Sequence, residues 1–142
     1  MEEPVRESKN FINLGIVLND KGEVLVVKRT VEEKVRGDKI LKWAFPGGRQ
    51  RSNESRSECV VREILVETGY KVKAVKELSL RVHPDLPILA AYHLCQLEES
   101  QPIQKPSEPE EITEVVWVNP TELKNLFTTS LDPKVAQELK IV

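Results

Sequence analysis

The sequence predicts a single mixed α/β domain, and three observations lead to this conclusion. Two apolar runs near the start, 11–18 and 23–29, are rich in β-forming residues and flank a turn sequence. The segment 55–69 carries the signals of a capped helix, and further β-type runs follow it. The chain has 142 residues, the size of one domain, and a chain of this length buries roughly 70% of its extended surface. Strands and helices therefore have enough chain to enclose a core.

The first two strands form a predicted hairpin. Phe11–Leu18 and Glu23–Arg29 are apolar and β-forming, and Asn19-Asp20-Lys21-Gly22 between them has turn composition. Residues 1–9 precede the first strand, are rich in charge, and are expected to be a flexible N-terminus.

A loop and a short strand follow the hairpin. Val31–Lys39 is too charged and aperiodic for a core element, so we expect an exposed loop there. Leu41–Phe45 predicts a short strand, and Pro46-Gly47-Gly48 predicts the turn that ends it. This turn leads directly to the predicted helix.

Residues 55–69 give the clearest helix signal. Ser55 and Glu58 have the spacing of a capping box, which places the N-cap at Ser55, and Gly69 supplies the C-terminal stop. Glu63 and Glu67 are four residues apart, so they lie roughly 40° from each other around the helix. Two carboxylates on adjacent turns can reach one cation or one water. Beside them we expect an apolar face formed by Val60, Val61, Ile64 and Leu65.

The C-terminal half alternates strands with a loop and two short helices. Strands are predicted at Val72–Val82, Ile88–Leu97 and Ile112–Val118. Ser100–Glu111 carries three prolines and is predicted to be a loop. Asn119 is a predicted N-cap with proline at the first helical position, which opens a helix to about Phe127. Asp132-Pro133 opens a last helix that extends to about Lys140.

Composition limits the cellular location and the binding partners that the sequence predicts. The chain has 21 Lys and Arg against 23 Asp and Glu, whereas general polyanion binders usually carry a basic excess, so nucleic acid is not the expected partner. No apolar run approaches the roughly 20 residues of a membrane helix, and the first residues lack a signal-peptide core. Cys59 and Cys95 form no disulfide framework; reduced thiols are the plainer interpretation, and a single bridge stays open. We therefore expect a cytoplasmic protein with no membrane association.

The stretch from Gly48 to Tyr70 carries the strongest motif in the chain. It resembles the signature of the Nudix hydrolases: Gly, five residues, Glu, seven residues, then Arg-Glu-apolar-x-Glu-Glu-x-Gly-apolar. Eight of the nine fixed positions match over these 23 residues, namely Gly48, Glu54, Arg62, Glu63, Ile64, Glu67, Gly69 and Tyr70. The strand and Pro-Gly-Gly turn that lead into the helix agree with this resemblance.

The resemblance implies a fold and a reaction. The implied fold is a curved mixed β-sheet sandwiched between α-helices, with a loop-helix-loop that binds Mg²⁺ or Mn²⁺. Members of the family hydrolyse nucleoside diphosphates linked to another moiety, with water attacking a phosphorus of the diphosphate, and dimers are common among them. These residue types suit that chemistry, because hard cations prefer oxygen ligands and phosphoryl transfer depends on charge neutralisation and positioning.

By position, the resemblance also assigns roles. Glu63 and Glu67 would bind the metal, with Glu63 also a candidate base or water-orienting group, and Glu54 would support the loop or the metal shell. Arg62 would orient the carboxylates by ion pairing, which makes Arg62, Glu63 and Glu67 the expected catalytic set. Substrate binding is expected from Arg29, Arg49, Gly47, Gly48 and Trp43, because guanidinium groups match phosphate geometry, glycines allow close approach, and an aromatic ring stacks on a base. For the two arginines and Trp43, ordinary surface or core roles stay open.

One position departs from the family pattern. Where the pattern has two consecutive glutamates, this chain has Val66-Glu67, and the missing carboxylate is normally a metal ligand. Its loss is expected to weaken metal binding, slow turnover or abolish hydrolysis. Two replacements stay open: Glu58, which the capping box already uses, and a glutamate of the proline-rich loop, as the resemblance implies, with Glu110 or Glu111 preferred to Glu108.

The sequence therefore predicts a metal-dependent pyrophosphohydrolase of a nucleoside triphosphate or another nucleoside-diphosphate-linked compound. Two alternatives stay open. Val66 favours a catalytically weak nucleotide-binding or interaction module. An ADP-sugar hydrolase is less favoured, because the short N-terminus leaves little room for the extra domain of many such enzymes. A homodimer is expected only because dimers are common in the family that the sequence resembles.

Overall fold

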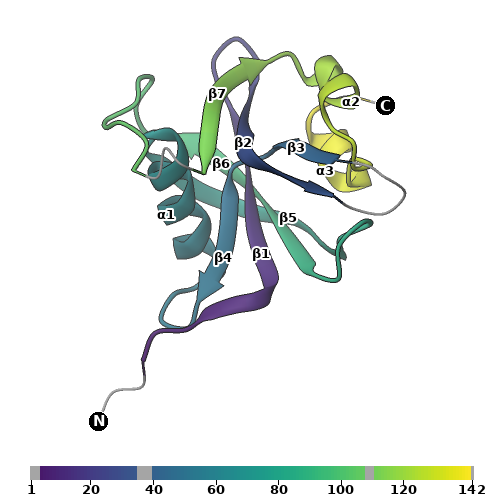
Figure 1. Cartoon of the computed structure of the whole chain (residues 1–142). Coiled ribbons are helices and arrows are strands. Elements are labelled where there is room, and N and C mark those ends of the chain that lie inside the picture. Colours follow the sequence, from purple (N-terminus) through teal and green to yellow (C-terminus); the bar gives the residue numbers. More distant parts are fainter. Residues whose placement is uncertain (1–3, 35–39, 108–110, 142) are drawn as a thin grey trace.

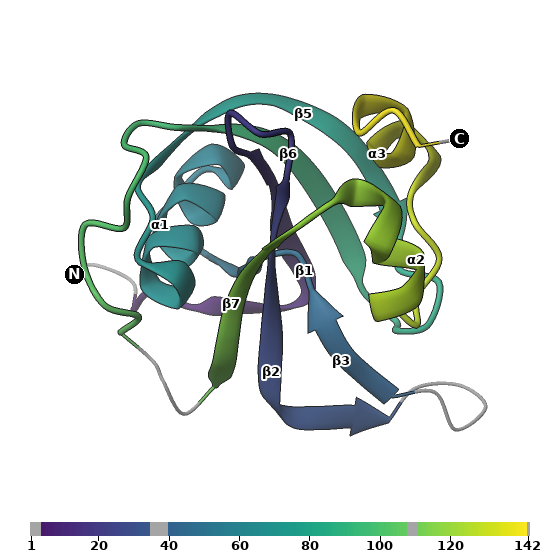
Figure 2. The ribbon, with the colours of Figure 1, turned by 90° about the horizontal axis from the view of Figure 1, so that it is seen from above.

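A single mixed sheet forms the centre of the computed structural model, which describes residues 4–34, 40–107 and 111–141. Helix α1 lies on one side of this sheet, and α2 and α3 lie on the other (Figure 1, Figure 2). The strands are β1 (Glu7–Leu18), β2 (Val24–Lys34), β3 (Ile40–Ala44), β4 (Gly47–Arg51), β5 (Val72–Val82), β6 (Leu89–Leu97) and β7 (Ile112–Val118). The helices are α1 (Arg56–Thr68), the 3₁₀ turn η2 (Pro120–Glu122), α2 (Leu123–Leu126) and α3 (Pro133–Glu138). The expected sheet between helices is confirmed.

Strand pairing places distant segments in one row across the sheet. The main order is β3-β2-β1-β6-β5, β4 pairs with β1, and β7 pairs with β2. β1 and β6 are parallel, and the other pairs are antiparallel. Leu14 pairs with Gly47 on one side and with Tyr92 on the other, and Tyr92 pairs with Ser79. The site described below is built along this row.

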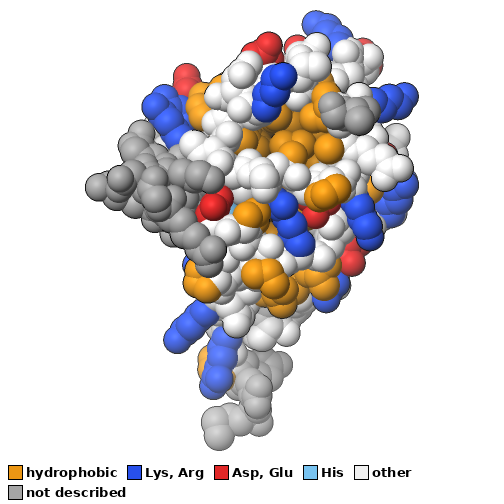
Figure 3. Space-filling view, turned by 90° about the vertical axis from the view of Figure 1, so that its right-hand side faces the viewer, with side chains coloured by type: hydrophobic (Ala, Val, Ile, Leu, Met, Phe, Trp, Pro, Cys, Tyr) orange, Lys and Arg blue, Asp and Glu red, His pale blue; other side chains and the backbone are white. Residues whose placement is uncertain are grey.

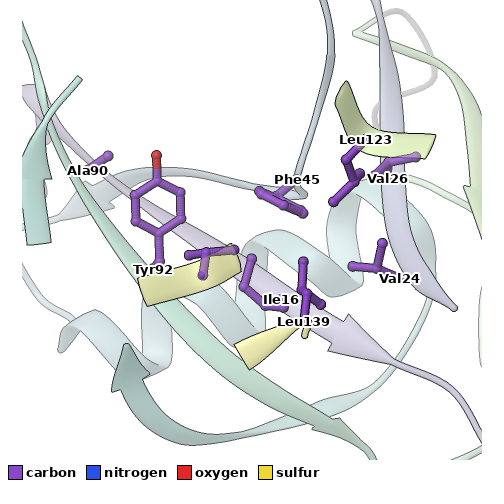
Figure 4. Packing of buried hydrophobic residues seen from close by; sticks show 9 residues of the cluster. Ile16, Val24, Val26, Phe45, Ala90, Tyr92, Leu123 and Leu139 are labelled. Carbon is purple, nitrogen blue, oxygen red and sulfur yellow. The ribbon is translucent and has the colours of Figure 1, made fainter. Parts of the chain in front are cut away.

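Two apolar clusters hold the helices against the sheet. On the α1 side, Val60 and Ile64 pack with Val17 of β1, whereas Ile16, the preceding residue, packs with the cluster under α2 and α3. This alternation follows from the pleat of a strand, which sends successive side chains to opposite faces. Figure 4 shows the second cluster, where Leu123 of α2 and Leu139 approach Ile16 and Phe45.

Helix α1 has the predicted bounds and lies close to the sheet. The Ser55 hydroxyl accepts from the Glu58 backbone N–H at 3.1 Å, and the Glu58 carboxylate accepts from the Ser55 N–H at 2.9 Å, so the capping box is confirmed. Gly69 ends the helix in the left-handed conformation at φ 80°. A Cβ at Gly15 of β1 would lie 2.4 Å from the Ile64 Cδ1, so the absence of a side chain there lets the helix approach the sheet.

Three boundary predictions in the N-terminal half need correction. The loop expected over Val31–Lys39 is wrong for residues 31–34, which continue β2 and pair with β3, while residues 35–39 lie outside the described residues. The flexible segment expected over residues 1–9 is wrong for residues 7–9, because β1 begins at Glu7 and pairs there with Arg51, while residues 1–3 lie outside the described residues. Gly47 and Gly48 open strand β4 rather than only turning the chain. In each case the strand continues through backbone pairing with a distant partner, which apolar patterning does not record.

The C-terminal elements follow the predicted order. Strands β5 and β7 have the expected bounds, and β6 begins one residue later than expected. Asn119 and Asp132 both accept backbone N–H groups as N-caps of η2 and α3. None of the helices in the described part of the chain is long and apolar enough to cross a membrane. Cys59 and Cys95 are both free and buried, so the open alternative of a bridge between them is excluded.

Candidate active site

Glu67 is a buried carboxylate on the last turn of α1. Its side chain is 9% exposed, and Oε1 accepts from the Gly47 backbone N–H at 2.8 Å. Burial raises the pKa of Glu67 to about 8; the Gly47 N–H and Arg29 lower it, whereas Glu63 and Glu111 raise it. Burial therefore disfavours the ionised form of Glu67, and a bound cation would favour it.

Arg62 connects the two other acidic residues of the motif. Its Nη1 donates to the Glu63 Oε1 at 2.7 Å, while Nε and Nη2 donate to the two oxygens of Glu54 at 2.9 and 2.7 Å. The Arg62 guanidinium is the main cause that lowers the pKa of Glu54 to about 2. The Arg51 backbone N–H also donates to Glu54, at 2.8 Å. Both oxygens of Glu54 thus accept from protein donors, and Oε1 of Glu63 is held by Arg62.

Two glycines bring the backbone against these carboxylates. A Cβ at Gly47 would lie 2.0 Å from the Asn13 carbonyl oxygen, and its φ of 154° is one that side chains rarely adopt. A Cβ at Gly48 would lie 2.7 Å from the Glu63 Cδ. The start of β4 therefore fits between β1 and the helix only because both positions lack side chains.

A cleft of about 750 Å³ contains most of the predicted site. Glu63 and Glu67 line it, and Arg81 and Tyr92 line it from β5 and β6. The other predicted residues that line the cleft are Arg62, Gly47, Gly48, Arg29, Arg49, Trp43 and Glu111. Glu54 does not line the cleft, and Glu110 lies outside the described residues. Figure 3 shows the side of the molecule that is on the right in Figure 1, where hydrophobic side chains lie among Lys and Arg side chains.

The proline-rich loop before β7 is attached to the end of α1. The Ser107 N–H donates to the Val66 carbonyl at 2.8 Å, and the Ile103 N–H donates to the Gly69 carbonyl at 2.8 Å. The chain then reaches Glu111, an exposed residue that lines the cleft and acts on the pKa of Glu67. Val66 is only half-buried and is not among the described residues that line the cleft.

The donor set fits a hard divalent cation. Within the ranges that the structure describes, no three His, Cys, Asp or Glu side chains are already grouped as a metal site. Glu63, Glu67 and Glu111 nevertheless offer only carboxylate oxygens, the ligands that Mg²⁺ and Mn²⁺ prefer. The charges of Glu63 and Glu111 both raise the pKa of Glu67, and a cation between the carboxylates would remove that repulsion.

Sequence reasoning missed a polar cluster that also lines the cleft. Arg81 donates to the Tyr92 hydroxyl and to the Ser130 carbonyl, and it lies 3.7 Å from the Asp132 carboxylate. Tyr92 lies in the predicted strand 88–97 and Asp132 at the predicted start of the last helix, so the sequence gives neither of them a role at the site. Alternation along β5 places Ser79 and Arg81 on one face of the strand, and this pattern is visible in the sequence. Their hydrogen-bond partners lie on β6 and just before α3, so the sequence pattern of β5 does not reveal them.

The comparisons with known proteins agree with this geometry. A family model described as NUDIX domain matches residues 12–139. A putative nudix hydrolase 1 of Caenorhabditis elegans is 36% identical over 81 residues, which is 55% of this chain and 21% of that protein. An 8-oxo-dGTP diphosphatase of Escherichia coli is 26% identical over 128 residues, covering 89% of this chain and 93% of the relative.

A solved NUDIX hydrolase of Nitrosomonas europaea has the same fold. It superposes with a TM-score of 0.69 at 21% identity, covering 94% of this chain and 87% of that one. The chain spans less than half the length of the first curated relatives it matches, whereas it covers almost all of the Escherichia coli protein. The family match extends over the sheet, α1 and the C-terminal helices, well beyond the motif on which the resemblance was based. The chain therefore belongs to the Nudix family.

Proposed function

We propose that this protein is a metal-dependent pyrophosphohydrolase of nucleoside triphosphates or related nucleoside-diphosphate compounds. The observation that carries the proposal is the convergence of Glu63 and Glu67 at a cleft that arginines also line. Carboxylates for a cation and guanidinium groups for phosphate oxygens are the two requirements of diphosphate hydrolysis. The similarity to an 8-oxo-dGTP diphosphatase over most of both chains supports a triphosphate substrate.

Each side chain has a distinct proposed task. Mg²⁺ or Mn²⁺ would neutralise charge on the diphosphate oxygens, and Glu63, Glu67 and Glu111 are the residues that would hold it. Glu63, oriented by its hydrogen bond from Arg62, also orients the attacking water or accepts its proton. Arg29 and Arg49, both at the cleft, bind phosphate oxygens of the substrate.

Glu54 has a positioning role in this proposal rather than a metal-binding role. Both of its oxygens accept from Arg62, and one also accepts from the Arg51 N–H. A carboxylate with this many strong donors would lose them on turning to a cation. Arg62, held by Glu54, in turn fixes the orientation of the Glu63 carboxylate.

The test is hydrolysis of a nucleotide panel with Mg²⁺ and with Mn²⁺, comparing the native protein with Glu67→Gln. The panel contains nucleoside triphosphates, 8-oxo-dGTP and ADP-ribose. We expect metal-dependent release of pyrophosphate or phosphate from at least one nucleotide, and a fall by orders of magnitude in Glu67→Gln. Glu98→Gln is the matched control, because Glu98 pairs with Lys71 at 3.3 Å, is exposed, and does not line the cleft.

Two results would contradict the proposal. Native protein that cleaves no member of the panel with either metal is not a nucleotide pyrophosphohydrolase. Equal losses in Glu67→Gln and Glu98→Gln would show that the charge change, and not the buried carboxylate, is responsible.

A second candidate is a module that binds a nucleotide and barely hydrolyses it. Val66 in place of a glutamate favours it. Ligand-induced stabilisation without turnover would support this candidate.

A further inference from the structure

Arg81 is fixed at the cleft by three neighbours. Its Nε and Nη2 donate to the Tyr92 hydroxyl oxygen at 3.2 and 3.0 Å, and Nη2 also donates to the Ser130 carbonyl at 2.8 Å. Its Nε lies 3.7 Å from the Asp132 Oδ2, and the Arg81 side chain is 20% exposed. The guanidinium is therefore held in one orientation before any ligand arrives, so little entropy is lost when it binds one.

The Asp132 carboxylate offers nothing further to a ligand. Its Oδ2 accepts from the Ser79 hydroxyl at 2.7 Å, and its Oδ1 accepts from the N–H groups of Lys134 and Val135 at 2.8 and 3.2 Å. The Asp132 side chain is only 4% exposed, so although Asp132 lines the cleft, its carboxylate is largely occupied by these protein donors. Asp132 nevertheless compensates the charge of Arg81, which leaves this part of the cleft close to neutral.

Arg81 and Tyr92 both keep hydrogen-bond donors available to a ligand. Within the described residues, the two N–H groups of Arg81 Nη1 and the hydroxyl hydrogen of Tyr92 have no protein acceptor. Figure 4 shows the Tyr92 oxygen pointing away from Ile16 and Leu139, the apolar residues beside its ring. A neutral group that carries acceptor atoms is the best complement to such a set, whereas an amino group would leave the donors unpaired.

The cluster lies at a suitable distance from the carboxylates. Gly47, whose N–H binds Glu67, is on β4, and Arg81 is on β5, with β1 and β6 between them. Three strand spacings amount to about 14 Å. With the diphosphate at Glu63 and Glu67, the base end of an extended nucleotide would therefore approach Arg81 and Tyr92, which line the same cleft.

We propose that Arg81 and Tyr92 select nucleotides whose base presents a carbonyl oxygen where adenine and cytosine present an amino group. The inference rests on the proposed function, and it narrows the substrate class to keto bases such as guanine, hypoxanthine and uracil. A carbonyl accepts from Arg81 Nη1 or from the Tyr92 hydroxyl, and an amino group in its place only donates. Arg81 and Tyr92 are thus specificity-determining residues at the end of the cleft opposite the carboxylates.

The kinetic test compares two pairs of nucleotides, and within each pair one base has a carbonyl group where the other has an amino group. We expect kcat/KM for ITP to exceed kcat/KM for ATP by about 10-fold or more. We likewise expect kcat/KM for UTP to exceed kcat/KM for CTP. Arg81→Met and Tyr92→Phe should each reduce the two ratios toward one. Arg56→Met is the matched control and should keep both ratios, because Arg56 is exposed, pairs with Glu77 at 2.7 Å, and does not line the cleft.

A binding measurement separates this inference from the proposed hydrolysis. Calorimetric titration with IMP and with AMP, without metal, reports base selection independently of turnover. Tighter IMP binding that Tyr92→Phe abolishes, in a protein that hydrolyses no nucleotide, would support the inference and refute the proposed function. Three results would overturn the inference. The first is hydrolysis with ITP/ATP and UTP/CTP ratios of kcat/KM near one, and the second is ratios that neither Arg81→Met nor Tyr92→Phe changes. The third is that neither IMP nor AMP binds. Because Arg81→Met removes contacts to Ser130 and Asp132, its melting temperature is measured beside its kinetics.

Discussion

At the scale of single residues, the site depends on one carboxylate that the protein does not fully compensate. Glu67 is buried, accepts one backbone N–H, and feels the negative charges of Glu63 and Glu111. Arg29 lowers its pKa without cancelling the effect of burial. Burial therefore favours the neutral form of Glu67 in the absence of a cation, and a bound cation would favour the ionised form.

Val66→Glu tests how the metal shell is completed. We expect little change in the maximal rate, because Val66 does not line the cleft and Glu111 already supplies a carboxylate near Glu67. Glu111→Gln should instead raise the metal concentration needed for half-maximal activity, whereas Glu99→Gln, an exposed control, should not. The measurement is a Mg²⁺ and Mn²⁺ titration of the hydrolysis rate. A large gain in Val66→Glu would show that the native site lacks a ligand and would favour the binding module.

Gly47→Ala tests the approach of β4 to β1. An added Cβ would lie 2.0 Å from the Asn13 carbonyl oxygen, and the backbone strain alone costs about 1–3 kcal/mol. Gly22→Ala is the control, because Gly22 also has a positive φ, 76°, but nothing lies within 4 Å of its added Cβ. We expect denaturant unfolding to show a clearly larger loss of stability for Gly47→Ala. Equal losses would mean that the overlap with Asn13 relaxes without cost.

At the scale of elements, local signals account for what the sequence predicts correctly. The capping box of Ser55 and Glu58 and the stop at Gly69 lie within the helix that they delimit, so α1 has the predicted ends. β4 was missed because its sequence, Gly-Gly-Arg-Gln-Arg, has no apolar alternation and pairs with a distant strand. The extension of β2 through residues 31–34 was missed for the same reason. Non-local pairing is the information that composition and periodicity lack.

Ser55→Ala tests the contribution of the cap to α1. Loss of the hydroxyl that accepts the Glu58 N–H should lower the free energy of unfolding by about 1 kcal/mol. Ser57→Ala is the matched control, because Ser57 is exposed on the same turn and has no capping contact, so it should be nearly neutral. Urea unfolding of the three proteins gives the comparison. An equal effect at both positions would exclude a specific role for the capping box.

At the scale of the whole molecule, a buried polar chain crosses the sheet. The His93 Nε2 lies 2.8 Å from the Asn13 Oδ1, the Asn13 amide donates to Gln50 at 3.1 Å, and Gln50 donates to the Glu54 carbonyl at 3.0 Å. Strands β6, β1 and β4 are thereby connected to the loop that holds Glu54. The motif residues were predictable from their spacing, whereas this chain and the Arg81 cluster required the strand order.

Stability should fall in mild acid because of His93. Burial is the main cause that lowers the pKa of His93; Glu77 raises it and Arg56 lowers it. As the pH falls through about 6.5, the unfolded chain binds a proton that the folded chain does not, so stability falls by up to about 1.4 kcal/mol per pH unit. His93→Gln removes this titration and should reduce the difference in unfolding free energy between about pH 7.5 and about pH 5. An unchanged difference would assign the acid sensitivity to other groups.

The two ends of the cleft come from opposite sides of the sheet, and this division affects how the protein can diverge. α1 supplies Glu63 and Glu67, whereas β5 and the segment before α3 supply Arg81, Ser130 and Asp132. Under the inference above, Asp132 is the side chain of this segment that helps to hold Arg81, because Ser130 acts through its backbone carbonyl, which a substitution does not remove. Substitutions at Asp132 are therefore expected to shift base preference without changing the carboxylates that α1 contributes to the cleft. Base preference and the carboxylate end of the cleft can thus diverge independently of each other.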